Sequence, residues 1–201
     1  MITLNKATSI NVEAFDTLFA ASYNTLSEEG FWEMTETLKY KRLMTYDERR
    51  DDYLESLTWI LDNDLDTDFV IEFKDDGNII GLAGAQDGSA YDNESYIRLG
   101  SFLTAPDNNG STTWVFSEDY IRARTVFWDE IGINAWIEVN KSINSRMLEL
   151  ANAYRNRIER HCTMEVYEEP YKIPIQIGTA VINFIASQPI PAKIKYTKLE
   201  S

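Results

Sequence analysis

A polar loop in the middle of the chain carries the clearest pattern for ligand chemistry. Residues 106–113 combine turn-forming and hydroxyl side chains, and Ser117 then precedes two acidic residues, which is typical of a helix N-cap and first turn. The start of a helix presents unpaired N–H groups and the positive end of its dipole, so it binds phosphate without a basic side chain. The candidate ligand-binding residues of this loop are Asn109, Gly110, Ser111, Thr112 and Thr113.

Other groups of residues that could do chemistry are weaker candidates. The only cysteine, Cys162, follows the only histidine, His161, and neighbouring residues of a strand point to opposite faces, which argues against a nucleophile–base pair. The same two counts exclude multi-histidine and cysteine-rich metal sites. The alternating aspartates of residues 62–68 lack the glycine and glutamate of a calcium loop, so we interpret them as a solvated acidic turn. We therefore expect no metal site.

The chain is strongly acidic, with 33 Asp and Glu against 19 Lys and Arg and a net charge of −14. This balance argues against a nucleic-acid binder and against docking on an anionic membrane, because both need clustered cations. It favours a basic substrate or a basic partner protein, and it leaves DNA mimicry as a weaker alternative. No acidic side chain lies between Asn108 and Ser117, so the net charge does not exclude a phosphate-bearing ligand at the loop.

The composition predicts a globular protein of one domain-sized unit, because 44 % of its 201 residues are hydrophobic. No stretch approaches 18 apolar residues, and the first residues form no long apolar run, so we expect a cytoplasmic protein that no membrane anchors.

The elements that must position the loop are predicted from hydrophobic periodicity and turn residues. Asn11 is a candidate cap for a first helix, a second helical region is predicted at residues 31–43, and Asp47 is a candidate cap for a third helix. The Asp76–Gly77 pair predicts a hairpin turn between two strands. The remaining expected elements are strands near residues 1–9, 96–104, 133–139 and 163–167, helices after 117 and 144, and an edge strand at 193–199.

This order, with a hairpin that ends in Ile-Ile-Gly-Leu-Ala-Gly before the polar loop, resembles the GNAT-type N-acyltransferase superfamily. Residues 137–140 followed by 144–147 are similar to the fifth strand of that family and the helix after it. The resemblance implies an α+β fold, a three-layer α/β sandwich with a mixed, mostly antiparallel central sheet flanked by helices. It covers residues 1–168, and residues 169–201 are then an extension packed on the same domain or on a partner chain.

The resemblance also implies acetyl-CoA as cofactor and acetyl transfer to an amine of a basic substrate as the activity. The loop would hold the pyrophosphate, Leu103, Thr104 and Asn144 would complete the cofactor site, and the pantetheine would lie where the strands around residues 102 and 137 splay apart. Glu138 would act as general base through water, while N–H groups of the preceding strand polarise the thioester. Tyr154 is a candidate general acid, one helical turn beyond Ala151, which stands where the family often has a tyrosine.

Two departures from the family pattern leave an alternative open. The loop has one glycine and is followed by the bulky Trp114, and Ala151 replaces the tyrosine. Such sequences resemble GNAT-like proteins of tailed bacteriophages. The alternative is therefore a catalytically inactive virion or host-interaction (anti-defence) protein that acts by protein binding, located in the host cytoplasm or the virion. A homo-oligomer formed through residues 193–199 also stays open.

Overall fold

A seven-stranded sheet forms the centre of the computed structural model, which describes residues 1–23, 32–34, 41–43, 45–63, 66–87, 97–139, 146–177 and 180–199. The strand order is β1-β4-β5-β6-β7-β9-β8, and only β6 and β7 are parallel. The elements are β1 (Ile2–Lys6), α1 (Val12–Tyr23), β2 (Trp32–Met34), β3 (Lys41–Leu43), α2 (Tyr46–Asp62), β4 (Phe69–Asp75), β5 (Asn78–Asp87), β6 (Ile97–Thr104), the 3-10 helix η2 (Trp114–Phe116), α4 (Glu118–Glu130), β7 (Ala135–Val139), α5 (Arg146–Ala153), α6 (Arg155–Ile158), β8 (Cys162–Ile177) and β9 (Ala180–Lys198).

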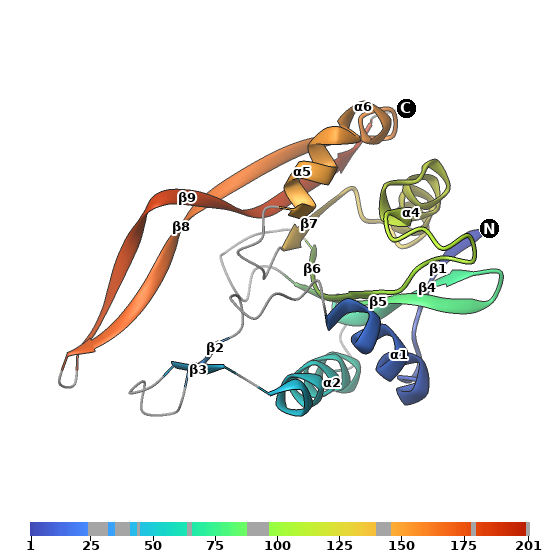
Figure 1. The fold of residues 1–201 in the computed structure, drawn as a ribbon. Coiled ribbons are helices and arrows are strands. Elements are labelled where there is room, and N and C mark those ends of the chain that lie inside the picture. The colour runs from blue at the N-terminus through green and yellow to red at the C-terminus, as the bar shows by residue number, and fades with distance from the viewer. Residues whose placement is uncertain are drawn as a thin grey trace.

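Helices cover both faces of this sheet, so the predicted three-layer α+β architecture is confirmed (Figure 1). On one face α1 and α2 bury Phe19 and Leu57 against Val70 and Leu82. On the other face α4, α5 and α6 share a core rich in large aromatic side chains, which includes Trp114, Tyr120, Trp128, Trp136, Ala151 and Ile158. The alternation of side chains along each strand separates the two cores.

Local capping and turn chemistry explain where several elements begin. Asn11 accepts a hydrogen bond from the N–H of Ala14 at 3.1 Å, which confirms the predicted cap of α1. The cap of α2 is Thr45 and not Asp47, because the Thr45 hydroxyl and Glu48 form a reciprocal capping box. The turn between β4 and β5 places Asp76 at φ 47° and Gly77 at φ 87°, the left-handed conformation that this hairpin requires.

Two predicted elements differ from the structure. Residues 32–34 and 41–43 pair as antiparallel strands, so the helical prediction for this region is wrong in the parts that the structure describes. Apolar spacing in so short a run fits a strand as well as a helix. The predicted edge strand at the C-terminus is part of β9, which lies between β7 and β8 and is therefore internal. The long strand β8, which precedes β9 in the chain, lies on its outer side and forms the edge of the described sheet instead.

The C-terminal strands are continuous with the rest of the sheet. Residue 168 lies within β8, and residues 193–197 of β9 pair with β7. Within β9, Ile194 and Tyr196 are buried in the core on the α4 side. These contacts place the end of the described chain on the same sheet, while the division of the chain at residue 168 remains a prediction.

A substitution at Gly81 is expected to destabilise this sheet more than the same substitution at Gly84. A Cβ atom at Gly81 would lie 2.8 Å from the ring of Phe73 and 3.1 Å from the carbonyl oxygen of Leu103, two groups that cannot easily move. We expect Gly81→Ala to lower the free energy of unfolding by about 1–3 kcal/mol. At Gly84 the close atom is the flexible end of Ile60 at 2.5 Å, so Gly84→Ala is the milder control. Urea unfolding of both variants measures the difference, and equal losses would contradict this account.

Candidate active site

The strand that leads into the polar loop contains a bulge at the point where it leaves its parallel neighbour. Leu82 pairs with Leu103 and Gly84 pairs with Gly100, so two residues of β6 stand opposite Ala83 alone. Such an extra residue bends the strand and interrupts its pairing. The pairing of β6 with β7 ends at Leu99 opposite Glu138, before the bulge. Beyond Leu99, no described strand pairs with β6 on its β7 side.

The end of this free stretch of β6 is closed by a side chain from α1. The N–H of Ala105 donates to the carbonyl of Ile80 at 2.9 Å, so the polar groups of Thr104 face away from β5. The buried hydroxyl of Ser22 binds both of them: it accepts from the Thr104 N–H and donates to the Thr104 carbonyl, each at 2.8 Å. The backbone edge that the resemblance assigns to the cofactor is thus capped at Thr104.

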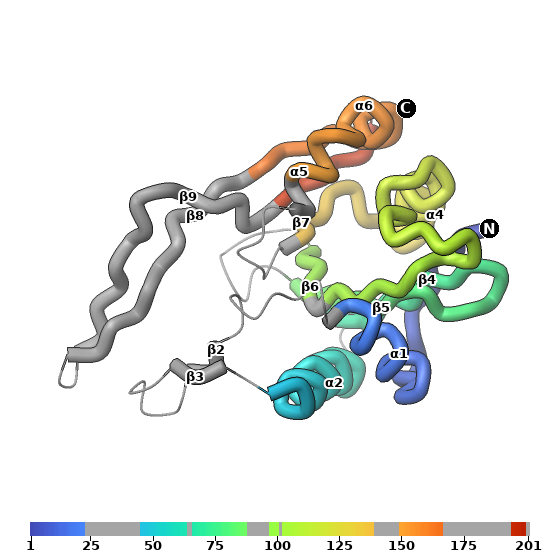
Figure 2. The backbone as a smooth tube through the Cα atoms, in the orientation of Figure 1, coloured from blue at the N-terminus to red at the C-terminus, as the bar shows by residue number. Residues whose placement is uncertain are grey.

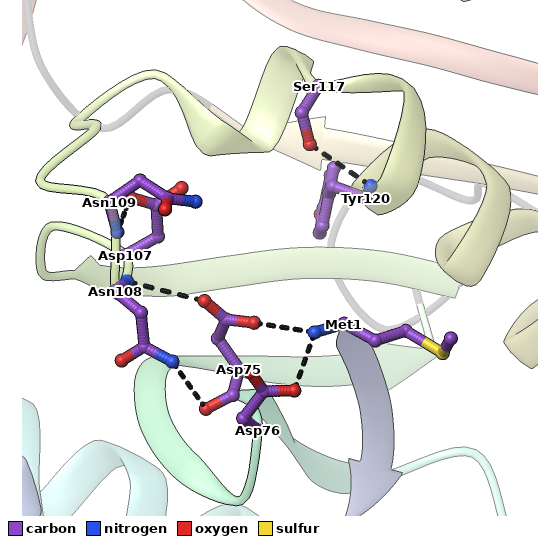
Figure 3. Close-up of polar contacts among 8 residues, drawn as sticks. All are labelled: Met1, Asp75, Asp76, Asp107, Asn108, Asn109, Ser117 and Tyr120. Atoms are coloured by element: carbon purple, nitrogen blue, oxygen red, sulfur yellow. Dashed lines mark hydrogen bonds and ion pairs between the residues drawn. The ribbon is translucent and has the colours of Figure 1, made fainter.

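The polar loop uses its own carboxylate as the acceptor for its N–H groups. Asp107 Oδ1 accepts from the N–H of Asn109 at 2.9 Å, drawn in Figure 3, and from that of Ser111 at 2.7 Å. The N–H of Gly110, whose φ is 75°, donates to the Asp107 carbonyl at 2.8 Å. The N–H of Thr113 donates to Ser111 Oγ at 3.3 Å. Four of the loop N–H groups predicted to face a phosphate, those of Asn109, Gly110, Ser111 and Thr113, therefore already have acceptors.

A second carboxylate, from the hairpin turn, ties the loop to the start of the chain (Figure 3). Asp75 accepts from the N–H of Asn108 at 3.3 Å and from the amino group of Met1 at 2.9 Å. The amino group also contacts Asp76 at 2.8 Å. The hydrogen bond from the Met1 amino group holds the pKa of Asp75 below the usual range, although burial opposes this. In turn, hydrogen bonds to Asp76 and Asp75 raise the pKa of the amino group to about 10.

The far end of the loop is anchored by Trp114 and by the cap of α4. Trp114 Nε1 donates to the Ala105 carbonyl at 2.8 Å, which joins the two ends of the loop. Ser117 caps α4 as predicted, since its hydroxyl accepts from the N–H of Tyr120 at 3.1 Å (Figure 3). Figure 2 shows the path from β6 through this loop into α4. The predicted order of strand, polar loop and helix is confirmed, while ligand binding by the loop stays a prediction.

The predicted base Glu138 forms an ion pair with a buried arginine. Its Oε1 accepts from Arg124 Nη1 at 2.7 Å and from Trp136 Nε1 at 3.3 Å. The guanidinium carbon of Arg124 lies 4.4 Å from the ring centre of Tyr196 and within 5.3 Å of two further rings. Burial, the largest single effect, disfavours the arginine charge, but attraction to Glu138 together with smaller effects of Tyr120, Tyr196 and Cys162 outweighs it and raises the pKa of Arg124. Burial also raises the pKa of Tyr120 and Tyr196, which keeps both hydroxyls protonated.

The predicted acid Tyr154 lies beside the end of the loop segment and not beside Glu138. Its ring stacks on Phe116 of η2 with centroids 5.5 Å apart, and the guanidinium carbon of Arg157 lies 5.0 Å from the centre of the Tyr154 ring. Arg157 also donates to the Phe116 carbonyl at 2.8 Å. No described contact joins Tyr154 to Glu138 or to the loop residues 107–113. Their roles as acid and base therefore remain predictions.

The other residues that the sequence singled out lie in the following positions. Leu103 is buried under α1 and α2, Thr112 is exposed on the loop, and Asn144 lies outside the described residues. His161 contacts Glu118 at 2.6 Å, while the thiol of Cys162 faces the Ile158 carbonyl and burial raises its pKa. Among the described residues, no group of side chains could hold a metal ion and no helix is long and apolar enough to cross a membrane.

Three residues that determine the chemistry of this region were not among the predicted site residues: Ser22, Asp107 and Arg124. Two of them had a recognisable signal. Asp107 stands two residues before Asn109, and aspartate at such a position often accepts N–H bonds from the following turn. Arg124 occupies the apolar stripe of α4 together with Tyr120 and Phe127, where a cation needs a buried partner. The contact of Ser22 with Thr104 spans 82 residues and had no local signal.

The pH dependence of folding is expected to include a contribution from Glu118. Its hydrogen bond with His161 lowers the pKa of Glu118 below the ordinary value of 4.5, against a smaller effect of burial. The stabilisation is therefore present above pH 4.5 and is lost as the pH falls through the lower folded pKa. We expect the difference in Tm between the wild type and Glu118→Gln to shrink from about pH 5 to about pH 3. Asp119→Asn, on an exposed neighbour, serves as control, and a constant difference would contradict the prediction.

A comparison with solved structures supports the fold. Neither a family model nor a curated protein sequence matches this chain. A structure described as a probable acetyltransferase from Staphylococcus epidermidis ATCC 12228 is similar with a TM-score of 0.54 and 14 % identity, over 98 % of this chain and 99 % of that one. An acetyltransferase from Streptococcus agalactiae 2603 gives 0.49 and 10 % over 99 % and 98 %. A spermidine N-acetyltransferase variant from Vibrio cholerae gives 0.45 and 14 % over 98 % and 93 %.

The match to the first of these structures covers almost the whole chain, and at 14 % identity it is evidence for the fold alone. The mixed sheet, its single parallel pair and the strand–loop–helix order agree with that likeness. The chain therefore has a divergent form of the GNAT-type acetyltransferase fold.

Proposed function

We propose that the chain is an N-acyltransferase that moves an acetyl group from acetyl-CoA to an amine. The observation that supports this most is the bulge in β6: the strand stops pairing with β7 just before the bulge and then leads directly into the polar loop. A free strand edge can pair with an extended, amide-containing chain such as pantetheine. The edge fits this role once Ser22 releases Thr104, whereas the loop donors are taken by Asp107.

The donor supplies an acetyl group activated as a thioester. In the proposed reaction the amine nitrogen bonds to the acetyl carbon as the carbon–sulfur bond breaks, so one proton leaves the amine and one reaches the sulfur. Both described contacts of Glu138 use Oε1, which leaves Oε2 to take the amine proton through a water molecule. The Tyr154 hydroxyl would protonate the leaving sulfur, and the Thr104 N–H would polarise the carbonyl.

A cationic amine is the substrate class that the charge of the chain favours. The net charge is −14, and α2 exposes several carboxylates to solvent, from Asp47, Asp51, Asp52, Glu55 and Asp62. A field of this sign attracts cations and raises the rate at which they arrive. Polyamines and lysine-rich peptides are therefore the first acceptors to test.

Isothermal titration with acetyl-CoA tests the proposal at its first step. We expect saturable binding, and release of the thiol when a polyamine or a lysine-rich peptide is added. Absence of binding at millimolar donor concentration would overturn the proposal. Coenzyme A without the acetyl group is the control ligand, since it should bind but release no further thiol.

The role of Tyr154 is tested by Tyr154→Phe, which keeps the ring that stacks on Phe116 and removes only the hydroxyl. We expect kcat to fall by about 10²-fold or more, because that is the ordinary contribution of a general acid. The KM of the amine and the Tm should stay unchanged, since the packing is retained. Steady-state kinetics and a thermal melt measure both, and an unchanged kcat would remove Tyr154 from the mechanism.

A second candidate function is protein binding without catalysis. The observation that favours it is that four of the loop N–H groups, the Thr104 edge and Glu138 Oε1 have partners within the chain. This candidate predicts a stoichiometric protein partner together with no response to acetyl-CoA. A donor that co-purifies with the protein would count against it.

A further inference from the structure

Asp107 is placed where its carboxylate meets the same N–H groups that a bound phosphate would need. It accepts from Asn109 and Ser111 through one oxygen, Oδ1, at 2.9 and 2.7 Å. We propose that Asp107 is an internal anion that competes with the phosphate groups of the donor and so sets the affinity of this loop. The proposal rests on the proposed function, because it concerns the same donor site.

The competition is unequal because Asp107 belongs to the loop itself. A tethered carboxylate meets its donors at a high effective concentration, whereas a free ligand meets them only at its concentration in solution. Hydrogen bonds from N–H groups to an ionised acceptor are also among the stronger ones. If the loop binds phosphate only when Asp107 turns away, the apparent Kd rises in proportion to the rarity of that state.

Asp107 forms no ion pair with a lysine or arginine among the described residues. Within the residues that the structure describes, no lysine or arginine side chain bonds to residues 107–113. The neighbouring Asp75 is also an anion, and its Met1 partner is shared with Asp76. A phosphate that approaches the loop therefore meets an uncompensated carboxylate in addition to occupied donors.

The substitution Asp107→Asn separates charge from shape. Asparagine keeps an oxygen at the Oδ1 position, so the turn through Asn109 and Ser111 can still form. It removes the negative charge and weakens the two hydrogen bonds. We expect the variant to bind coenzyme A about tenfold or more tighter than the wild type, because a like charge at close range is removed. Its affinity for pantetheine, which has no phosphate, should stay the same.

The matched control is Asp119→Asn, which changes the net charge by the same amount at an exposed position in the first turn of α4. Titration calorimetry of the wild type and both variants with coenzyme A and pantetheine gives the comparison. A gain confined to Asp107→Asn and to coenzyme A supports the proposal. An unchanged affinity, or an equal gain in both variants, overturns it.

Inorganic pyrophosphate gives a second readout that does not depend on acetyl transfer. In labelled protein, the amide signals of Gly110 and Ser111 should shift on addition of pyrophosphate in Asp107→Asn and much less in the wild type. No shift in the variant overturns the proposal, whatever the activity of the wild type. A shift together with a wild type that binds no acetyl-CoA supports the role of Asp107 and overturns the proposed function alone.

Discussion

Replacing Glu138 by alanine should lower the free energy of unfolding by about 3–5 kcal/mol. The reason is the partner that remains: the Arg124 side chain is only 4 % exposed and lies among aromatic rings. In the part of the chain that the structure describes, Glu138 is the only carboxylate that pairs with it. Removing that carboxylate leaves a buried charge without compensation, which costs far more than the ion pair itself contributes. Chemical denaturation of the purified variant measures the loss.

A paired substitution distinguishes this mechanism from a simple loss of packing. Arg124→Met combined with Glu138→Leu removes both charges and fills the space with apolar atoms, so it should be more stable than Glu138→Ala alone. Glu130→Ala, at an exposed position of α4, is the control and should change stability by no more than about 0.5 kcal/mol. If the free energy of unfolding of Glu138→Ala lies within about 1 kcal/mol of the wild-type value, the buried pair is not the source of stability that we infer.

This prediction also affects the test of catalysis. A loss of activity in a Glu138 variant has two sources, the missing base and the disturbed core around Arg124. Glu138→Gln keeps an oxygen that can accept from Arg124 Nη1 and is the better variant for kinetics. Activity should be compared only at temperatures where the variant remains folded.

The parts of the fold that were predictable are those encoded by local chemistry. Asp76–Gly77 specifies a hairpin because two successive residues there need positive φ. Ser117 and the carboxylates after it specify the start of α4. The cap of α2 was placed two residues late, because Thr45 and Asp47 are both good caps and only the reciprocal bond with Glu48 distinguishes them.

The position of β9 could not be read from its own sequence. The alternating pattern of residues 193–199 shows a strand, but the place of a strand within a sheet depends on its partners. Here residues 193–197 pair with β7 on one side while β8 covers the other. The amphipathic pattern is the same for an edge strand and for an internal strand with one solvated face.

The candidate site was the least predictable part, for an electrostatic reason. No acidic residue lies between Asn108 and Ser117, which predicts a loop that is open to phosphate. The chain brings two carboxylates to it from outside that interval, Asp107 from the preceding residue and Asp75 from the hairpin. A count of charges along the sequence does not include carboxylates that folding brings close from elsewhere in the chain. Asp75 is such a carboxylate, because it lies 33 residues from its partner Asn108.

Trp114 is expected to be the second residue whose loss has a large effect. It is 1 % exposed, its ring packs 5.2 Å from that of Tyr120 and 5.7 Å from that of Phe73, and its Nε1 donates to the Ala105 carbonyl. We expect Trp114→Ala to lower the free energy of unfolding by about 3–5 kcal/mol, because it leaves a large cavity in the core on the α4 side of the sheet. Urea unfolding gives the value.

Trp114→Phe separates the ring from the hydrogen bond that closes the loop. Phenylalanine fills much of the cavity but leaves the Ala105 carbonyl without its donor, so we expect a loss of about 1–3 kcal/mol. Because that hydrogen bond joins the two ends of the loop, the amides of Asn109 and Ser111 should also exchange faster with solvent in Trp114→Phe than in the wild type. Amide exchange that stays unchanged would mean that Asp107 alone holds the loop, and Trp114 would then act only through packing.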